Sequence, residues 1–185
     1  MNVDRRPRER RTHACGAPRA RPSGCRLAFS RLAVPVGGLS TVRTMRIALA
    51  SDHAGFELKN ALVAHLRAEG HDVADLGTHT KESVDYPDFG KAVGEAVAGG
   101  QAERGVLVCS SGIGISIAAN KVAGVRAALV MNEDMAEFTR RHNDANVIAF
   151  GQKYVTPDMA KKYLAIFLTT AFEGGRHERR VGKMC

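Results

Sequence analysis

The chain has 185 residues, enough for one domain with a substantial core but too few for a second domain of ordinary size. Its formal net charge of +8 lies entirely within residues 1–44, where ten arginines outnumber two acidic residues, whereas residues 45–185 carry seventeen basic and seventeen acidic side chains. The body therefore lacks the basic excess that nucleic-acid binding needs, and no run approaches the roughly 20 apolar residues of a membrane span, so we expect neither partner.

Residues 1–44 are rich in Arg, Pro, Ala and Gly and show no helical or strand period, a pattern typical of disorder. Two interpretations stay open for this basic extension. The first is an organelle transit peptide, which is Arg-rich and acid-poor, and the second is an upstream start, with translation beginning at Met45. A functional basic arm is a third, less favoured interpretation. The second interpretation predicts a cytoplasmic protein. The cysteines agree with a reducing compartment, because they form neither a disulfide framework nor a CxxC metal motif.

The body begins with a predicted strand at 46–50 and a helix near 55–69. Between them lies the sequence SDHAG, which places Asp52 and His53 at the carboxyl end of the strand. Asp52 is a candidate catalytic carboxylate, although by itself it is better explained as a cap of the following helix. His53 is a candidate donor to a phosphate.

A second strand is predicted at 72–76 and a second helix near 87–99. The loop between them reads GTHTKESVDYPDFG. Tyr86, directly before Pro87, is its one candidate for contact with a ligand, and the rest of the segment is typical of an ordinary polar loop.

The third predicted strand, 105–109, ends in CSSGIG and leads into a helix near 113–122. Small residues here allow backbone N–H groups to converge at the start of a helix, where negative charge is stabilised. A thiolate at Cys109 would gain from the same arrangement. A buried structural cysteine before a glycine turn is the alternative. The turn matches neither a Walker A loop nor the dinucleotide fingerprint.

Strands follow at 126–131 and 147–150, with helices near 133–142 and 157–173. The first of these helices ends in RHNDAN, so His142 lies where a helix terminus favours a protonated imidazole, beside Asn143. A solvated capping histidine is the alternative. After the last helix, RHERR places Arg176 and Arg180 on one helical face, suited either to a phosphate clamp or to a solvated tail.

Strands that alternate with helices of this length pair in parallel, with helices on both faces. We therefore predict an α/β fold, a three-layer doubly wound sandwich with a five-stranded parallel sheet, in a single domain over residues 45–185. Ligands of such sheets bind at the carboxyl ends of the strands. We expect the thiol, the glycine turn, Asp52 and His142 to gather at that edge, within reach of the C-terminal arginines.

Five motifs, SDHAG, DYP, CSSGIGISIAANK, RHNDANVIAFG and EGGRHERR, occur in this order and at this spacing in type B ribose-5-phosphate isomerases, which residues 45–185 resemble. The resemblance implies interconversion of ribose 5-phosphate and ribulose 5-phosphate without metal or organic cofactor. It also implies a homodimer, or a tetramer, with its active site at the subunit interface. By the same resemblance, Cys109 is the base that moves a proton between C2 and C1 through a cis-enediolate.

The resemblance assigns further roles. Backbone N–H groups around Ser111, Gly112 and Gly114 stabilise the enediolate oxygens, and Ser111 adds its hydroxyl. His142 opens the furanose ring with help from Asp52. The remaining expected substrate contacts are Asn143 and Tyr86 to sugar hydroxyls, and His53, Arg176 and Arg180 to the phosphate.

The chain departs from the family pattern in three places, of which one is a short tail after Arg180, so that we expect the contacts made by longer tails to be missing. Lys153 stands where an arginine is common near the phosphate and offers a point charge rather than a planar fork. Some relatives use a glutamate further along the catalytic loop, where this chain has Ile115 and Ser116, which leaves Cys109 as the base.

Other functions remain in competition with this one. A six-carbon sugar phosphate, allose 6-phosphate or galactose 6-phosphate, is the nearest alternative substrate. A non-catalytic, flavodoxin-like phosphate-binding module is an alternative of a different class, and it would not need the thiol. A Cys–His hydrolase fits less well, because paired arginines favour a phosphorylated substrate.

Overall fold

The computed structural model describes residues 43–184. Almost all of the basic extension, with Cys15 and Cys25, lies outside these residues, so the prediction of disorder there concerns residues that are not described. Cys185 also lies outside them. The elements are, in order, β1 (Arg46–Ser51), η1 (His53–Gly55), α1 (Phe56–Ala68), β2 (Asp72–Asp75), α2 (Tyr86–Ala98), β3 (Arg104–Cys109), α3 (Ile113–Ala119), β4 (Ala127–Leu129), α4 (Glu133–Arg141), β5 (Val147–Gly151), α5 (Pro157–Thr169) and α6 (Arg176–Val181).

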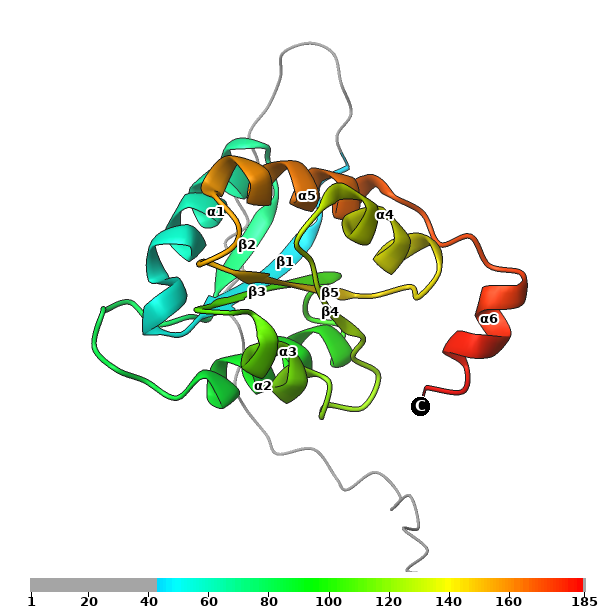
Figure 1. Ribbon diagram of the computed structural model, residues 1–185, viewed down its shortest axis with the longest axis horizontal. Helices are drawn as coiled ribbons and strands as arrows, with labels where there is room; N and C mark the ends of the chain where they lie inside the picture. Colours follow the sequence, from blue (N-terminus) through cyan, green and yellow to red (C-terminus); the bar gives the residue numbers. More distant parts are fainter. Residues whose placement is uncertain (1–42, 185) are drawn as a thin grey trace, which may run out of the picture.

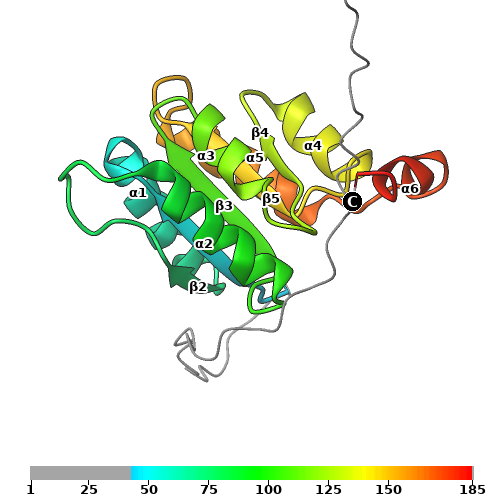
Figure 2. The ribbon, with the colours of Figure 1, turned by 90° about the horizontal axis from the view of Figure 1, so that it is seen from below.

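The five strands form one parallel sheet in the order β2-β1-β3-β5-β4. Helices α1, α4 and α5 cover one face and α2 and α3 the other, while α6 projects beyond the end of α4 (Figure 1; Figure 2 gives the view from below). The predicted three-layer α/β sandwich is confirmed. No helix among residues 43–184 is long and apolar enough to cross a membrane.

The strands are apolar throughout, but their side chains alternate between the two faces of the sheet and pack into two separate cores. In β3, Val106 and Val108 face the layer of α1 and α5, whereas Leu107 and Cys109 face α2 and α3. Both sets are almost fully buried. The near-continuous hydrophobic runs in the sequence thus reflect strands covered on both faces.

The ends of the long helices follow local rules. The Thr156 hydroxyl accepts a hydrogen bond from the backbone N–H of Met159 over 3.3 Å, and Pro157 occupies the first turn of α5. Asn132 caps α4 in the same way, through a 2.8 Å bond from the N–H of Met135. Each cap satisfies a backbone donor that the first turn of a helix leaves unpaired.

The boundaries differ from the prediction at three elements. The predicted α5 extended to residue 173 but ends at Thr169, because the chain leaves the helix to let the N–H of Glu173 bond to the carbonyl of Arg141 over 3.0 Å. The predicted helix at 113–122 ends at Ala119. Strand β4 is shorter than the predicted 126–131, and the Asn120 side chain pairs with both the N–H and the C=O of Ala127 at 2.8 Å. That amide occupies the hydrogen-bonding groups of an edge strand.

Candidate active site

Cys109 is the last residue of β3 and the starting point of the site. Its side chain is 4% exposed, and its Sγ atom accepts a hydrogen bond from the backbone N–H of Gly112 at 3.0 Å. The thiol therefore has a donor suited to a base, although it is otherwise packed in the core of the α2–α3 layer.

The turn at residues 110–112 depends on the glycine. Gly112 has φ +78°, and a Cβ atom there would lie 2.4 Å from Leu129 Cδ1 and 2.9 Å from the carbonyl carbon of Phe150. Only glycine accepts both the backbone conformation and the crowding. The hydroxyl of Ser111 accepts a 3.4 Å bond from the N–H of Ile113, which fixes the side chain near the start of α3.

The sheet register brings the end of β1 to the same place. Ser51 pairs with Val108, so Asp52 and Cys109 follow adjacent strand ends. Asp52 is 6% exposed and its Oδ1 accepts the N–H of Gly55 at 3.0 Å, capping the short turn η1. The Asp52 carboxylate is thus a capping group, at a strand end adjacent to the end of β3.

Three further candidates lie at the same edge of the sheet: His53, Tyr86 and Lys153. The Nδ1 atom of His53 accepts the N–H of Val84 at 3.2 Å, which leaves its Nε2 to carry the proton and to donate. The ring of Tyr86 packs so closely on Gly114 that a Cβ there would lie 2.7 Å from its Cε2 atom. The backbone of Lys153 bonds to the Ser110 carbonyl at 3.1 Å.

His142 and Asn143 lie elsewhere, which corrects the expectation that the site residues gather at one edge. Helix α4 runs back from the carboxyl end of β4, and His142 follows its last turn. The carbonyl of Asn143 accepts a 3.2 Å bond from Nε of Arg126, the residue before β4. Both residues therefore lie at the amino-terminal edge of the sheet, opposite Cys109.

The two C-terminal arginines belong to this second group. Arg176 and Arg180 lie one turn apart on α6, as predicted, and α6 lies beside the end of α4 (Figure 1). Its residue His177 stacks on His142 with ring centroids 4.3 Å apart and planes inclined by 2°. The expected site residues thus form two groups, one at each edge of the sheet, and each group would be one half-site if the site lies between two subunits.

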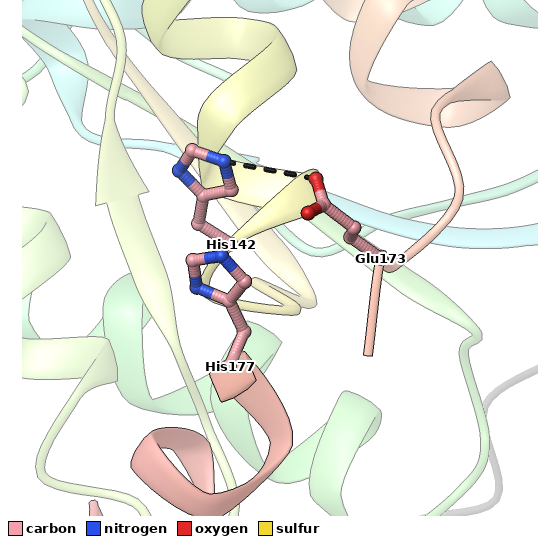
Figure 3. A group of neighbouring side chains, drawn as sticks. All are labelled: His142, Glu173 and His177. Carbon is pink, nitrogen blue, oxygen red and sulfur yellow. Dashed lines mark ion pairs between the residues drawn. The ribbon is translucent and has the colours of Figure 1, made fainter. Parts of the chain in front are cut away.

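Sequence reasoning missed two residues that contact His142, Glu173 and His177. Figure 3 shows Glu173 directed at His142, with 3.8 Å between Oε2 and Nε2. Both residues stand inside the motif EGGRHERR, but nothing in their spacing distinguishes them from solvated tail residues. Their role follows only from the position of α6 against α4.

His142, Glu173 and His177 also form a group that could be considered for a metal ion, since their ligand atoms lie within 4.8 Å of one another. The geometry does not favour this use. The two imidazole planes are parallel instead of converging, and His177 Nε2 already accepts a 3.3 Å bond from Nε of Arg176. Glu173 is bound by Arg141 at 3.0 Å. We assign no metal to this group.

Comparison with known proteins gives consistent results. The profile of a family described as Ribose/Galactose Isomerase matches residues 47–184. Ribose-5-phosphate isomerase B of Escherichia coli (strain K12) is 47% identical over 136 residues, which cover 74% of this chain and 91% of that protein.

Solved structures agree in fold as well as in sequence. Ribose-5-phosphate isomerase B of Clostridium thermocellum has a TM-score of 0.75 and 50% identity, covering 76% of this chain and 95% of that one. The enzyme of Mycoplasma genitalium, solved with bound ribulose 5-phosphate, has a TM-score of 0.72 and 41% identity, covering 75% and 95%.

Proposed function

The chain belongs to the ribose/galactose isomerase family and is an isomerase, and from that premise we propose that it interconverts D-ribose 5-phosphate and D-ribulose 5-phosphate. The observation that carries the proposal is the hydrogen bond from the N–H of Gly112 to Cys109 Sγ, at the end of a central strand. A relative with 41% identity was solved with bound ribulose 5-phosphate. No metal or organic cofactor takes part in the proposed reaction.

The reaction begins with ring opening. His142, assisted by Asp52, moves a proton from the anomeric hydroxyl to the furanose oxygen. This transfer opens the ring and releases the open-chain aldehyde. His142 and Asp52 lie on different half-sites of one chain, so this step needs residues from two subunits. Asn143 and Tyr86 are proposed to hold the sugar hydroxyls.

The Cys109 thiolate then removes the proton from C2. The electrons of the C2–H bond form a C1=C2 double bond, and O1 becomes an enediolate oxygen. Backbone N–H groups of the 111–114 turn are suited to stabilise this charge, with the Ser111 hydroxyl nearby. The thiol returns the proton to C1 while the proton of O2 passes to O1, so C2 becomes the ketone and C1 carries a hydroxyl. Cys109 acts throughout as a base, not as a nucleophile.

The phosphate is assigned to four basic side chains. His53 has its Nε2–H free to donate, and Lys153 follows β5 on the same edge of the sheet. Arg176 and Arg180 would come from the partner subunit and supply the planar forks that suit phosphate oxygens.

A homodimer follows from the two half-sites. A two-fold axis would bring the His142 edge of one chain to the Cys109 edge of the other and create two complete sites. The surface beside the turn is suitable for such contact, because Ile113 and Ile117 on α3 are 51% and 56% exposed and Tyr86 is 42% exposed. Apolar side chains gathered beside a site typically mark an interface.

The deciding experiment measures conversion of ribose 5-phosphate to ribulose 5-phosphate by the purified protein, with and without EDTA, beside allose 6-phosphate and galactose 6-phosphate. We expect turnover of the pentose phosphate to be the fastest and unaffected by the chelator. Cys109→Ala should reduce kcat by about a hundred- to ten-thousandfold, the usual contribution of a positioned base. Undiminished turnover in that variant would overturn the mechanism, and faster turnover of a hexose phosphate would overturn the substrate.

A further inference from the structure

We infer that Glu173 and His177 are positioning residues for His142, fixing the plane and one edge of its imidazole. This inference rests on the proposed function, in which His142 acts on the sugar ring. Ring opening requires a nitrogen atom held at the correct place and angle, and His142 follows the last turn of α4, where a side chain has few neighbours on its own helix.

The plane of the ring is fixed by stacking. His177 is 4% exposed and lies parallel to His142, with centroids 4.3 Å apart. Phe138, one turn earlier on α4, adds a second stacked contact at 4.8 Å and 18°. A ring stacked on two others loses contact area with both when it turns about its Cβ–Cγ bond. His142 is therefore restrained in the torsion that turns its nitrogens about the Cβ–Cγ bond.

The edge of the ring is fixed by Glu173. Its Oε2 lies 3.8 Å from His142 Nε2 and accepts a 3.0 Å hydrogen bond from Arg141, while its backbone N–H bonds to the Arg141 carbonyl at 3.0 Å. The hydrogen bond from Arg141 lowers the pKa of Glu173, so the carboxylate keeps its charge. A fixed negative charge beside Nε2 keeps that nitrogen directed at Glu173 and leaves the other ring nitrogen for contacts elsewhere. In Figure 3 this second nitrogen points away from Glu173.

The stacked partner is itself suited to the task because it is neutral. Burial lowers the pKa of His177, and the nearby His142 and Arg176 lower it further. Arg176 Nε donates to His177 Nε2 at 3.3 Å, which requires a lone pair on that atom. A neutral ring does not repel the positive charge that His142 carries when it acts as an acid.

The chemistry of the two substrates separates this role from a general structural one. Ribose 5-phosphate is a closed furanose and must be opened before C2 can lose its proton. Ribulose 5-phosphate cannot close a furanose ring, since the oxygen it would need is phosphorylated. Exchange of its C1 hydrogen for deuterium from D2O therefore reports the Cys109 step without the His142 step.

The test compares Glu173→Ala and His177→Ala with unaltered protein in both reactions. We expect kcat for ribose 5-phosphate to fall about ten- to a hundredfold, the usual cost of a misplaced catalytic group, with C1 exchange changed by less than about twofold. His177→Phe, which restores a flat ring, should recover most of the lost turnover. In a His142→Ala background, Glu173→Ala should cause no further loss.

The matched control is Glu137→Ala. Glu137 binds the same Arg141, at 2.7 Å, and is 43% exposed against 44% for Glu173, but it has no contact with His142. If Glu173→Ala behaves like Glu137→Ala, or if both reactions fall equally in the two test variants, the inference is wrong. If unaltered protein performs neither reaction, the proposed function fails and the inference with it.

Discussion

The backbone N–H of Gly112 donates a hydrogen bond to the sulfur of Cys109 over 3.0 Å, from a residue with φ +78° that no side chain could replace without a clash. The donor and the thiol are three residues apart, so the same short turn both ends the strand and directs an amide at the sulfur. The first prediction concerns this turn.

Gly112→Ala should reduce kcat for ribose 5-phosphate by about a hundredfold, because the new methyl group pushes the turn away from the thiol. It should also lower the free energy of unfolding by about 1–3 kcal/mol through backbone strain and crowding. Gly70→Ala is the control, since Gly70 has φ +84° but nothing within 4 Å of its would-be Cβ. Steady-state kinetics and urea unfolding measure the two effects, and equal activity in the two variants would contradict the assignment.

Gly114→Ala should act on binding more than on turnover. A Cβ at Gly114 would lie 2.7 Å from the ring of Tyr86, so the tyrosine side chain must shift from the position in which it is proposed to hold the sugar. We expect KM for ribose 5-phosphate to rise several-fold, about 1 kcal/mol of binding, with kcat and the thermal midpoint nearly unchanged. A fall in kcat with unchanged KM would show that the turn, not Tyr86, had moved.

The ion pair between Lys59 and Asp75 should be important for stability. Lys59 Nζ lies 2.6 Å from Asp75 Oδ2, and the lysine side chain is 0% exposed. Asp75→Ala would leave a buried charge without its partner and should cost about 3–5 kcal/mol of the free energy of unfolding.

A second pair of the same length provides the comparison. Lys81 and Glu57 are also 2.6 Å apart, but their side chains are 68% and 69% exposed. Glu57→Ala should cost far less than Asp75→Ala, because water screens an exposed ion pair. Denaturant unfolding of both variants compares the loss of stability at a buried pair with the loss at an exposed pair. Similar losses of the free energy of unfolding would contradict the prediction.

The stability of the fold should decrease on acidification below about pH 6.5. Burial lowers the pKa of both His71 and His177 from the ordinary value of 6.5. The two groups bind protons more readily in the unfolded chain. Their contribution is therefore fully present above pH 6.5 and is lost as the pH falls through their lowered folded-state values.

His71→Phe and His177→Phe should each flatten part of this pH dependence. The first histidine accepts the N–H of Met45 at 3.3 Å and the second accepts Nε of Arg176 at 3.3 Å, so protonation removes an acceptor in both cases. Thermal midpoints measured from pH 5 to 8 supply the test. Unchanged slopes in both variants would assign the acid sensitivity to other groups.

Much of the fold could be predicted from the sequence because its local signals agree with its tertiary structure. Every strand and the five long helices were placed to within a few residues, and Thr156 with Pro157 marked the start of α5 correctly. The end of α5 could not be found locally, since it depends on the docking of Glu173 against Arg141. The turn η1 was not predicted, because Asp52 was interpreted as a cap of the following helix, whereas its carboxylate caps η1.

The site was predictable in its members but not in its arrangement. Cys109, Gly112 and Asp52 follow strands, and their common edge follows from the parallel sheet. His142 ends a helix that begins at that edge, so it must lie at the other, and the helix direction was a signal that the sequence already contained. The parallel contact between His142 and His177 requires α6 in place and has no counterpart in the sequence.

Two half-sites at opposite edges of one sheet also mean that two inactive proteins should restore activity to each other. In a dimer of one Cys109→Ala chain with one His142→Ala chain, both lesions fall in the same site and the other site is intact. Random mixing of the two variants would leave about a quarter of all sites complete. Chains that hold a whole site within themselves cannot complement in this way, so the recovery of turnover on co-refolding separates the two architectures in a single tube.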